Sequence, residues 1–270
     1  MGEARTPVAG IGSNLDDGVL RIVIDRPERR NALDDQMVES LLEQIDRAGQ
    51  DEEIRVVHIR GAGEHFCGGF DILSRNAGSD AKPRVGNIQR RLPTQAHRLI
   101  PAILNVQTPV VCEVRGWAAG IGLQLVLAAD FAVVAEDARL WEPFAERGFT
   151  PDSGATWLLP KRIGEVRARR MLLLGETVNG SVAVEWQMVH HCVPVDQLSS
   201  TTEELIALLA KGPTVSLGLT KWLLQSGRSA NLETALANEA FALEISSRSK
   251  DFREGLAAFA EKRAPKFSGR

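Results

Sequence analysis

Two glycine-containing turns, each directly after an apolar strand-like run, constrain this chain more than any other feature. The first covers residues 65–71 (HFCGGFD) and follows the β-branched run 54–60, and the second covers residues 115–124 (RGWAAGIGLQ) and follows 109–114. Glycine adopts backbone shapes that other residues reach only with strain, and such turns leave amide N–H groups unpaired. Two N–H groups that converge on one point form an oxyanion hole, which stabilises an enolate-like or tetrahedral oxyanion.

The segments around these turns alternate between strand and helix patterns. Residues 18–25 read as a strand, and Asp34 is expected as the N-cap of the helix that follows. That helix has three apolar residues on one face: Met37, Leu41 and Ile45. Strand, helix, strand, turn, helix and strand then recur through about residue 135. This order predicts an α/β class built from repeated right-handed crossovers.

Beyond Val195 the strand patterns stop, and four helices are expected. Their ranges are 203–211, 215–225, 232–247 and 253–263. The last two carry an apolar stripe made of Leu236, Ala240, Leu243, Leu256 and Phe259. We expect a core over residues 1–195 and a helical region over 196–270, which caps its own core or packs on a neighbouring subunit.

Composition excludes several classes of partner. The 270 residues carry a net charge of −3, which provides no basic surface for a nucleic acid. No apolar run approaches the length of a membrane-spanning helix, and the start has no apolar leader, so we expect a cytoplasmic protein without a membrane partner. The three cysteines lie far apart and the histidines lack ligand spacing, so we expect free thiols and no metal site.

The two turns resemble those of the crotonase superfamily, the enoyl-CoA hydratase/isomerase family. Residues 66–72 fit its pattern F-x-x-G-x-D-[IL], and residues 116–125 fit G-x-A-x-G-x-G-x-x-L. Further matches at 24–33, 148–154 and 254–263 follow in the same order, so the resemblance spans nearly the whole chain. It implies a crotonase-like spiral of repeated ββα units with an acyl-CoA site in the core. It also implies an acyl-CoA thioester as substrate, no separate cofactor, and homotrimers that can pair into hexamers through the C-terminal helices.

The resemblance also assigns the oxyanion donors. They are the backbone N–H groups of Gly68 and Ile121. Ile121 opens a helix expected over about 120–129, so the helix dipole adds to its hydrogen bond. Family members usually have glycine where Ile121 stands; the amide survives that change, but a branched side chain fills space near the thioester.

The acid–base residues depart from the hydratase pattern. Hydratases of this family hold and split a water molecule between two glutamates, and the matching positions here are Gln124 and Phe144. An amide cannot take a proton at neutral pH, and phenylalanine has no proton chemistry. Water addition by the usual route is therefore not expected.

Asp152 is the carboxylate that resemblance places in the site. Several isomerases of the family carry their single working acid in this segment, and one group that removes a proton and returns it elsewhere suffices for isomerisation. The alternative for Asp152 is an N-cap of the next helix. Glu146 is a possible substitute acid–base residue if its segment is extended, or else a solvated charge, and Glu142 is a weaker candidate.

Substrate contacts follow from the same resemblance. Arg29 or Arg30, beside Ala32, would bind the CoA arm, and the backbone from Glu64 to Phe66 would face the adenine. Lys262 on the terminal helix would reach a phosphate, across a subunit boundary if the chain is a trimer. Large apolar residues that could line the acyl pocket, or else belong to the core, are Phe70, Leu73, Trp117, Trp141, Phe144 and Trp157. Residues 74–86 are expected to form either a loop over the site or a solvated connection.

Three functions remain open at this point. The first is an enoyl-CoA isomerase, or an isomerase of a related ring substrate, that uses Asp152. The second is an enoyl-CoA hydratase with relocated carboxylates, for example Glu146 and Asp152. The third is a protein that binds acyl-CoA without turnover.

Overall fold

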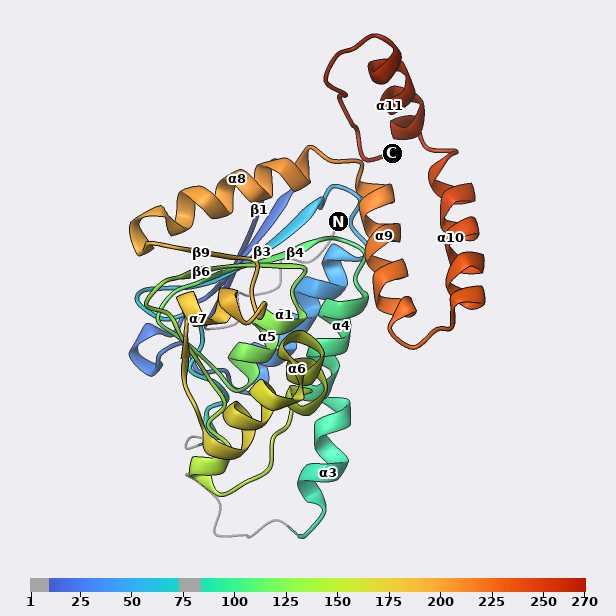
Figure 1. The fold of residues 1–270 in the computed structure, drawn as a ribbon. Helices are drawn as coiled ribbons and strands as arrows, with labels where there is room; N and C mark the ends of the chain where they lie inside the picture. The colour runs from blue at the N-terminus through green and yellow to red at the C-terminus, as the bar shows by residue number, and fades with distance from the viewer. Residues whose placement is uncertain (1–9, 73–83) are drawn as a thin grey trace, which may run out of the picture.

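The fold is described from a computed structural model, which covers residues 10–72 and 84–270. Most of the segment 74–86, for which a loop was expected, lies outside these residues. Within them the chain is a mixed α/β structure, as predicted, with the elements arranged as Figure 1 shows.

Within the described residues, the main sheet has six strands in the order β1-β2-β3-β4-β6-β9. The strands are β1 (Ile11–Asp16), β2 (Val19–Ile24), β3 (Val56–Gly61), β4 (Val110–Val114), β6 (Phe131–Ala135) and β9 (His191–Val193). β1 and β2 form an antiparallel hairpin, and every other neighbouring pair is parallel. A smaller sheet of β5 (Trp117–Ala119), β7 (Arg139–Trp141) and β8 (Val178–Asn179) lies beyond the strand ends that carry the glycine turns.

Helices cover both faces of the main sheet (Figure 1). Side chains alternate between the faces along a strand, so Val56 and Val57 enter different apolar clusters. On one face lie α1 (Asp35–Ala48), α4 (Leu99–Asn105) and α5 (Ile121–Ala128). The predicted cap of α1 is confirmed, because the Asp34 side chain accepts the Met37 N–H, and the predicted apolar face is buried.

Helix α8 (Leu198–Ala210) covers the other face of the sheet. Its residues Ile206 and Leu209 pack with Val19, Val56 and Val111 of the strands. We expected this segment in the C-terminal helical region, but its contacts place it with the core. The sequence did not distinguish a helix of the core from a helix of the C-terminal region. An amphipathic pattern predicts that one face is buried, but it does not identify the surface on which that face packs.

The remaining helices connect the core to the C-terminal end. They are α3 (Asn87–Arg91), α6 (Ala155–Leu174), α7 (Gly180–Glu185), α9 (Thr214–Gly227), α10 (Leu232–Ser246) and α11 (Lys250–Ala260). α10 packs along α9, and Figure 1 shows α10 and α11 standing away from the body of the protein. The apolar stripe predicted on these two helices is exposed, with Phe259 86% and Leu243 64% accessible. Among the described residues, no helix is long and apolar enough to cross a membrane.

Candidate active site

The first glycine turn crosses the segment that follows β2. A parallel bridge joins Leu33 to Phe70: Leu33 N–H donates to Gly69 O, and Asp71 N–H donates to Leu33 O, both at 2.8 Å. Gly68 N–H donates to Arg30 O at 2.7 Å. The prediction that the Gly68 N–H serves as an oxyanion donor is therefore wrong in this structure, because that amide already has an acceptor.

The direction of the backbone N–H groups does not alternate regularly between Gly68 and Asp71. Their N–H groups both point to the segment 30–33 although they are three residues apart, which a regular strand would not allow. The irregularity lies at Gly69, whose φ of +104° is in the region that favours glycine. In a parallel bridge the central residue directs its own N–H to the opposite edge, so Phe70 N–H points away from Leu33. That edge faces the second turn, because Cys67 pairs with Ala118 there.

The second turn forms the N-terminus of α5. Gly120 is the N-cap with φ +52°, and Ile121 is the first helical residue. The first N–H groups of a helix have no acceptor within that helix, so Ile121 N–H is directed out of the helix end, where the dipole favours negative charge. The Ile121 side chain is 3% exposed and packs in the core. The sequence predicted that this branched side chain fills space near the thioester, and in the structure it is enclosed among core residues.

The loop before the first turn is anchored by two polar side chains. Asn31 is fully buried; its Nδ2 donates to Ala62 O at 2.9 Å and to His65 O at 2.6 Å. The Arg26 guanidinium lies 3.0 Å from the Asp71 carboxylate and donates to Ala32 O at 3.3 Å. These contacts fix the segment 26–33 against both ends of the first turn.

Gln124 lies one turn into α5 and is fully buried. Its Nε2 donates to Gly120 O at 3.1 Å and to Glu142 Oε1 at 2.7 Å. Glu142 is also fully buried and follows β7, whose last residue, Trp141, accepts the Gly120 N–H at 3.0 Å. A carboxyl group thus lies at the N-terminal end of α5, joined to it through the Gln124 amide.

Glu142 also interacts with Asp152. Burial raises the pKa of Glu142 to about 8; the Gln124 hydrogen bond opposes this shift, and the negative charge of Asp152 adds to it. The sequence had ranked Glu142 below Glu146, and nothing in the run W-E-P-F signals that this one side chain is enclosed. The signal is three-dimensional: the loop after β7 is hydrogen-bonded to the start of α5.

Asp152 does not cap a helix. The N-cap of α6 is Gly154, with φ +90° and no side-chain cap bond, and the backbone oxygen of Asp152 accepts the Ala155 N–H at 3.0 Å. Between them Ser153 is buried with φ +51°, a left-handed conformation that is uncommon for residues other than glycine. The alternative reading of Asp152 as an N-cap is therefore wrong.

Glu146 is not part of this group. It lies in the 3₁₀ turn Ala145–Arg147 rather than in an extended segment, and it is exposed. Its carboxylate lies against Gly175 at the end of α6. The expectation that a spacing of two residues from Phe144 restores the same face fails, because the face repeats every two residues only in a strand.

Phe144 brings an aromatic wall to the helix end. Its ring atom Cζ would lie 4.0 Å from a β-carbon placed on Gly120, and the ring packs edge-on against Phe149 at 5.4 Å between centroids. Trp157 lies elsewhere, on α6, with the cations Lys161 and Arg228 over its ring. Phe144 therefore lies beside the start of α5, whereas Trp157 lies on another helix.

The residues predicted to bind the CoA arm are placed unequally. Arg29 and Arg30 are exposed at the turn that precedes Ala32. Phe66 is fully buried, and its N–H donates to Arg115 O at 2.9 Å, which contradicts a substrate contact through its ring or N–H. Lys262 is exposed after α11, on the part of the chain that stands away from the body (Figure 1).

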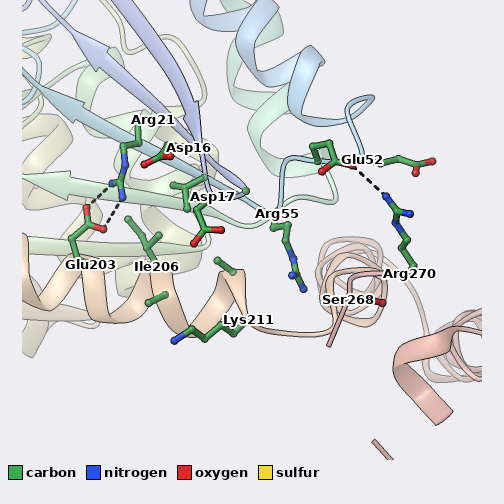
Figure 2. A pocket seen from close by; sticks show the side chains of 15 residues that line it. Asp16, Asp17, Arg21, Glu52, Arg55, Glu203, Ile206, Lys211, Ser268 and Arg270 are labelled. Carbon is green, nitrogen blue, oxygen red and sulfur yellow. Dashed lines mark hydrogen bonds and ion pairs between the residues drawn. The ribbon is translucent and has the colours of Figure 1, made fainter. Parts of the chain in front are cut away.

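A separate cavity of about 490 Å³ lies at the opposite end of the sheet (Figure 2). It is bounded by the β1–β2 turn at Asp16, by the start of β3 at Arg55, and by α8. Its charges are mixed and include two ion pairs: Arg21 donates to Glu203 at 2.8 Å, and Arg270 lies 3.3 Å from Glu53. The oxyanion turns follow the carboxyl ends of β3 and β4, so this cavity is not part of their site.

Metal-ligating side chains do not gather in the part of the chain that the structure describes: no three His, Cys, Asp or Glu residues are grouped as a metal site requires. The thiols of Cys67 and Cys112 are buried and free. Burial raises the pKa of Cys67 to about 12, so this thiol is not a nucleophile near neutral pH.

Comparison with known proteins finds similar sequences and structures along nearly the whole chain. A family model described as enoyl-CoA hydratase/isomerase matches residues 14–270. The 1,2-epoxyphenylacetyl-CoA isomerase of Escherichia coli (strain K12) is 36% identical over 259 residues, which are 96% of this chain and 98% of that protein. A Rhodobacter capsulatus protein named "Probable enoyl-CoA hydratase" is 34% identical, over 95% of this chain and 96% of its own. The crystal structure of an enoyl-CoA hydratase from Bacillus anthracis superposes with a TM-score of 0.89 at 29% identity, over 97% of this chain and 100% of the other.

Proposed function

The chain belongs to the enoyl-CoA hydratase/isomerase family, and from this premise we propose that it isomerises an acyl-CoA thioester through an enolate, with Asp152 moving the proton. The observation that carries the proposal is the pair Gln124 and Phe144. These residues occupy the positions at which the resemblance expects the two hydratase glutamates, and neither can exchange a proton at neutral pH. The N-cap of α6 is Gly154, so Asp152 is not the cap of that helix.

In this proposal the Asp152 carboxylate removes a proton from a carbon near the thioester. The electron pair of that C–H bond moves onto the thioester oxygen and gives an enolate. The oxyanion accepts hydrogen bonds from Ile121 N–H, at the positive end of α5, and from Phe70 N–H, which points toward the same edge. The enolate then collapses, and a proton returns at a different carbon.

The acyl group in this proposal is cyclic or short and unsaturated. Phe144 lies beside Gly120 and packs edge-on with Phe149, so an aromatic wall stands where the acyl part would meet the oxyanion site. The name of the Escherichia coli relative supports a ring-bearing acyl group. The CoA arm would contact Arg29 and Arg30, and the substrate would bring the only coenzyme that the reaction needs.

The test is isomerisation of 3-enoyl-CoA and of an aromatic ring epoxide CoA thioester by the wild type and by Asp152→Asn. We expect the variant to lose roughly a hundredfold or more in kcat, the usual contribution of a positioned acid–base group. The matched control is Glu146→Gln, which removes an exposed carboxylate from the same region and should keep wild-type kcat. Full activity of Asp152→Asn would show that Asp152 is not the base.

A hydratase is the second candidate, and one observation favours it. Glu142 lies close enough to Asp152 for their charges to interact, so two carboxyl groups are present although both differ from the usual pair. Hydration of crotonyl-CoA, followed by the loss of its conjugated absorbance, distinguishes this function from the first. Binding of acyl-CoA without turnover of any of these substrates would instead support a non-catalytic protein.

A further inference from the structure

We propose that Glu142 is the second proton-transfer residue of this site: in its acid form it delivers the proton that Asp152 does not return itself. The inference rests on the proposed isomerase function. It assigns to Glu142 a role that neither Gln124 nor Phe144 can fill.

The first observation is the burial of Glu142 and its incomplete hydrogen bonding. One carboxyl oxygen, Oε1, accepts from Gln124 Nε2 at 2.7 Å, while the other, Oε2, has no hydrogen-bond partner among the described residues. The side chain is fully buried. An enclosed carboxylate with one unsatisfied oxygen is costly as an anion, whereas a carboxylic acid carries no charge and offers a proton on that oxygen.

The second observation is the position of Glu142 relative to the oxyanion site. Gln124 Nε2 also donates to Gly120 O, and Gly120 N–H donates to Trp141 O at 3.0 Å. These bonds hold the loop that contains Glu142 beside Gly120, the N-cap of α5. Gly120 directly precedes Ile121, the proposed oxyanion donor. Gln124 thus acts as a positioning residue, which holds Oε1 and leaves Oε2 without a hydrogen-bond partner among the described residues.

The third observation is the relationship to Asp152. The groups that act on Glu142 are Asp152, from the segment before α6, and the neutral Gln124 amide, from α5. The following residues on its own loop, Pro143 and Phe144, are apolar. Asp152 as an anion and Glu142 as an acid are therefore mutually stabilising, because each lowers the cost of the other's state.

The proton balance closes over one turnover. Asp152 takes a proton from the first carbon, and the electron pair of the broken C–H bond forms the enolate. The enolate re-forms the thioester carbonyl while a new C–H bond takes the proton of Glu142, whose O–H bond breaks. The cycle ends with Asp152 protonated and Glu142 ionised, and transfer of one proton from Asp152 to Glu142, directly or through a water molecule, restores the starting state.

The test uses Glu142→Gln, which keeps the size and the buried position but cannot deliver a proton. Isomerisation is run in D₂O, with the deuterium content of the product measured during the first turnovers. We expect the wild type to place solvent deuterium in the product, because the Glu142 proton exchanges with solvent. Glu142→Gln should be slower by roughly a hundredfold or more and should carry over the substrate's own hydrogen. Equal rate and equal deuterium content in the variant would overturn the proposal.

A second measurement needs no loss of the carboxyl group. Burial raises the pKa of Glu142 to about 8. We therefore expect wild-type kcat/KM to fall above pH 8, because the acid form of Glu142 is lost there. Gln124→Leu removes a hydrogen bond that lowers this pKa, so the fall should move to higher pH. A wild-type kcat/KM that stays flat through pH 9, or a fall that Gln124→Leu leaves in place, contradicts the assignment.

The two proposals fail in different ways. If the wild type isomerises none of the thioesters, the proposed function fails. If the wild type isomerises and Asp152→Asn does not, while Glu142→Gln matches the wild type, only the role of Glu142 fails.

Discussion

Gly122 lies against Cys67 so closely that a β-carbon on Gly122 would be 2.6 Å from the Cys67 carbonyl oxygen. Gly122 lies in the first helical turn of α5. Cys67 directly precedes the two glycines of the glycine turn at residues 65–71. Hydrogen bonds join the same segments: Cys67 N–H donates to Trp117 O, and Ala119 N–H donates to Cys67 O, both at 2.9 Å. The distance between the Ile121 and Phe70 amides is therefore set by backbone packing, which side chains cannot easily adjust.

Gly122→Ala should disrupt this packing. The new methyl group would meet the backbone oxygen of Cys67 and also its β-carbon and sulfur, so one of the two turns must move. We expect a loss of roughly 1–3 kcal/mol in the free energy of unfolding, typical of overpacking, together with a large fall in kcat. Urea unfolding and the isomerisation assay measure the two effects.

The control for this substitution is Gly227→Ala on α9. A β-carbon there has no atom within 4 Å, so it should be tolerated or slightly stabilising. A Gly122→Ala variant as stable and active as Gly227→Ala would show that the turns can separate without consequence.

Arg26→Gln should loosen the first turn. The guanidinium lies 3.0 Å from Asp71, whose side chain is 6% exposed, and it also donates to Ala32 O. We expect a loss of roughly 1.5–3 kcal/mol in the free energy of unfolding, the range for hydrogen bonds to charged groups. The value of kcat/KM should fall as well, because Phe70 N–H lies next to Asp71. Arg47→Gln, which breaks an exposed ion pair with Asp51 at 3.4 Å, should cost below about 0.5 kcal/mol and leave activity unchanged.

Much of this architecture could be predicted from the sequence because it is encoded locally. The cap at Asp34, the apolar face of α1 and the strand at 18–25 each depend on neighbouring residues, and each is found in the structure. The order of the two glycine turns after apolar strands likewise predicted a shared edge. These features repeat over few residues, so a linear pattern contains them.

The details of the site could not be predicted because they depend on contacts between distant segments. Whether Gly68 or Phe70 directs its N–H to the site is decided by the φ of Gly69 and by the bridge to Leu33. The importance of Glu142 over Glu146 is decided by burial against α5, while the two residues look alike in the sequence. Sequence patterns give the residues of a site, but its hydrogen bonds require the packed structure.

Glu113 should make the fold sensitive to acid. It is 4% exposed on β4, accepts from Arg115 at 2.9 Å and from Ser199 at 3.1 Å, and lies 3.5 Å from His58. Burial alone would raise its pKa, but the neighbouring His58 and the hydrogen bond from Arg115 outweigh burial and lower the pKa from 4.5 to about 2. A carboxyl group whose pKa is lower when folded stabilises the protein above its unfolded pKa. This contribution is lost as the pH falls from about 4.5 toward 2.

Glu113→Gln should therefore cost roughly 2–4 kcal/mol in the free energy of unfolding at pH 7 and less at pH 3. Urea unfolding at pH 3, 4, 5 and 7 measures the difference between the variant and the wild type. The control is Glu165→Gln, whose partner Arg169 is exposed and which should change little at any of these pH values. A difference for Glu113→Gln that is constant from pH 3 to 7 would contradict the ionised network.

The apolar stripe on α10 and α11 should be an interface between subunits. Leu236 is 54% exposed and Phe259 86% exposed, on helices that stand away from the body of the protein (Figure 1). Apolar surface of this kind is a liability unless a partner covers it. We expect a trimer, or two trimers paired, by light scattering at micromolar concentration, and smaller species for the double variant Leu236→Glu with Phe259→Glu. Leu208→Glu, at an exposed apolar residue of α8, should leave the assembly intact.

A substitution of Lys262 should affect substrate binding without affecting the assembly of subunits. Lys262 follows α11 and is exposed. The family resemblance predicts that in a trimer it reaches a neighbour's CoA arm. Lys262→Gln should keep the wild-type mass in light scattering and raise KM for the CoA thioester several-fold, because one cation near a phosphate is lost. The same substitution should leave kcat unchanged, since Lys262 would lie far from the reacting carbons. A wild-type protein that is a monodisperse monomer would rule out both the interface and any contribution of Lys262 to a neighbouring site.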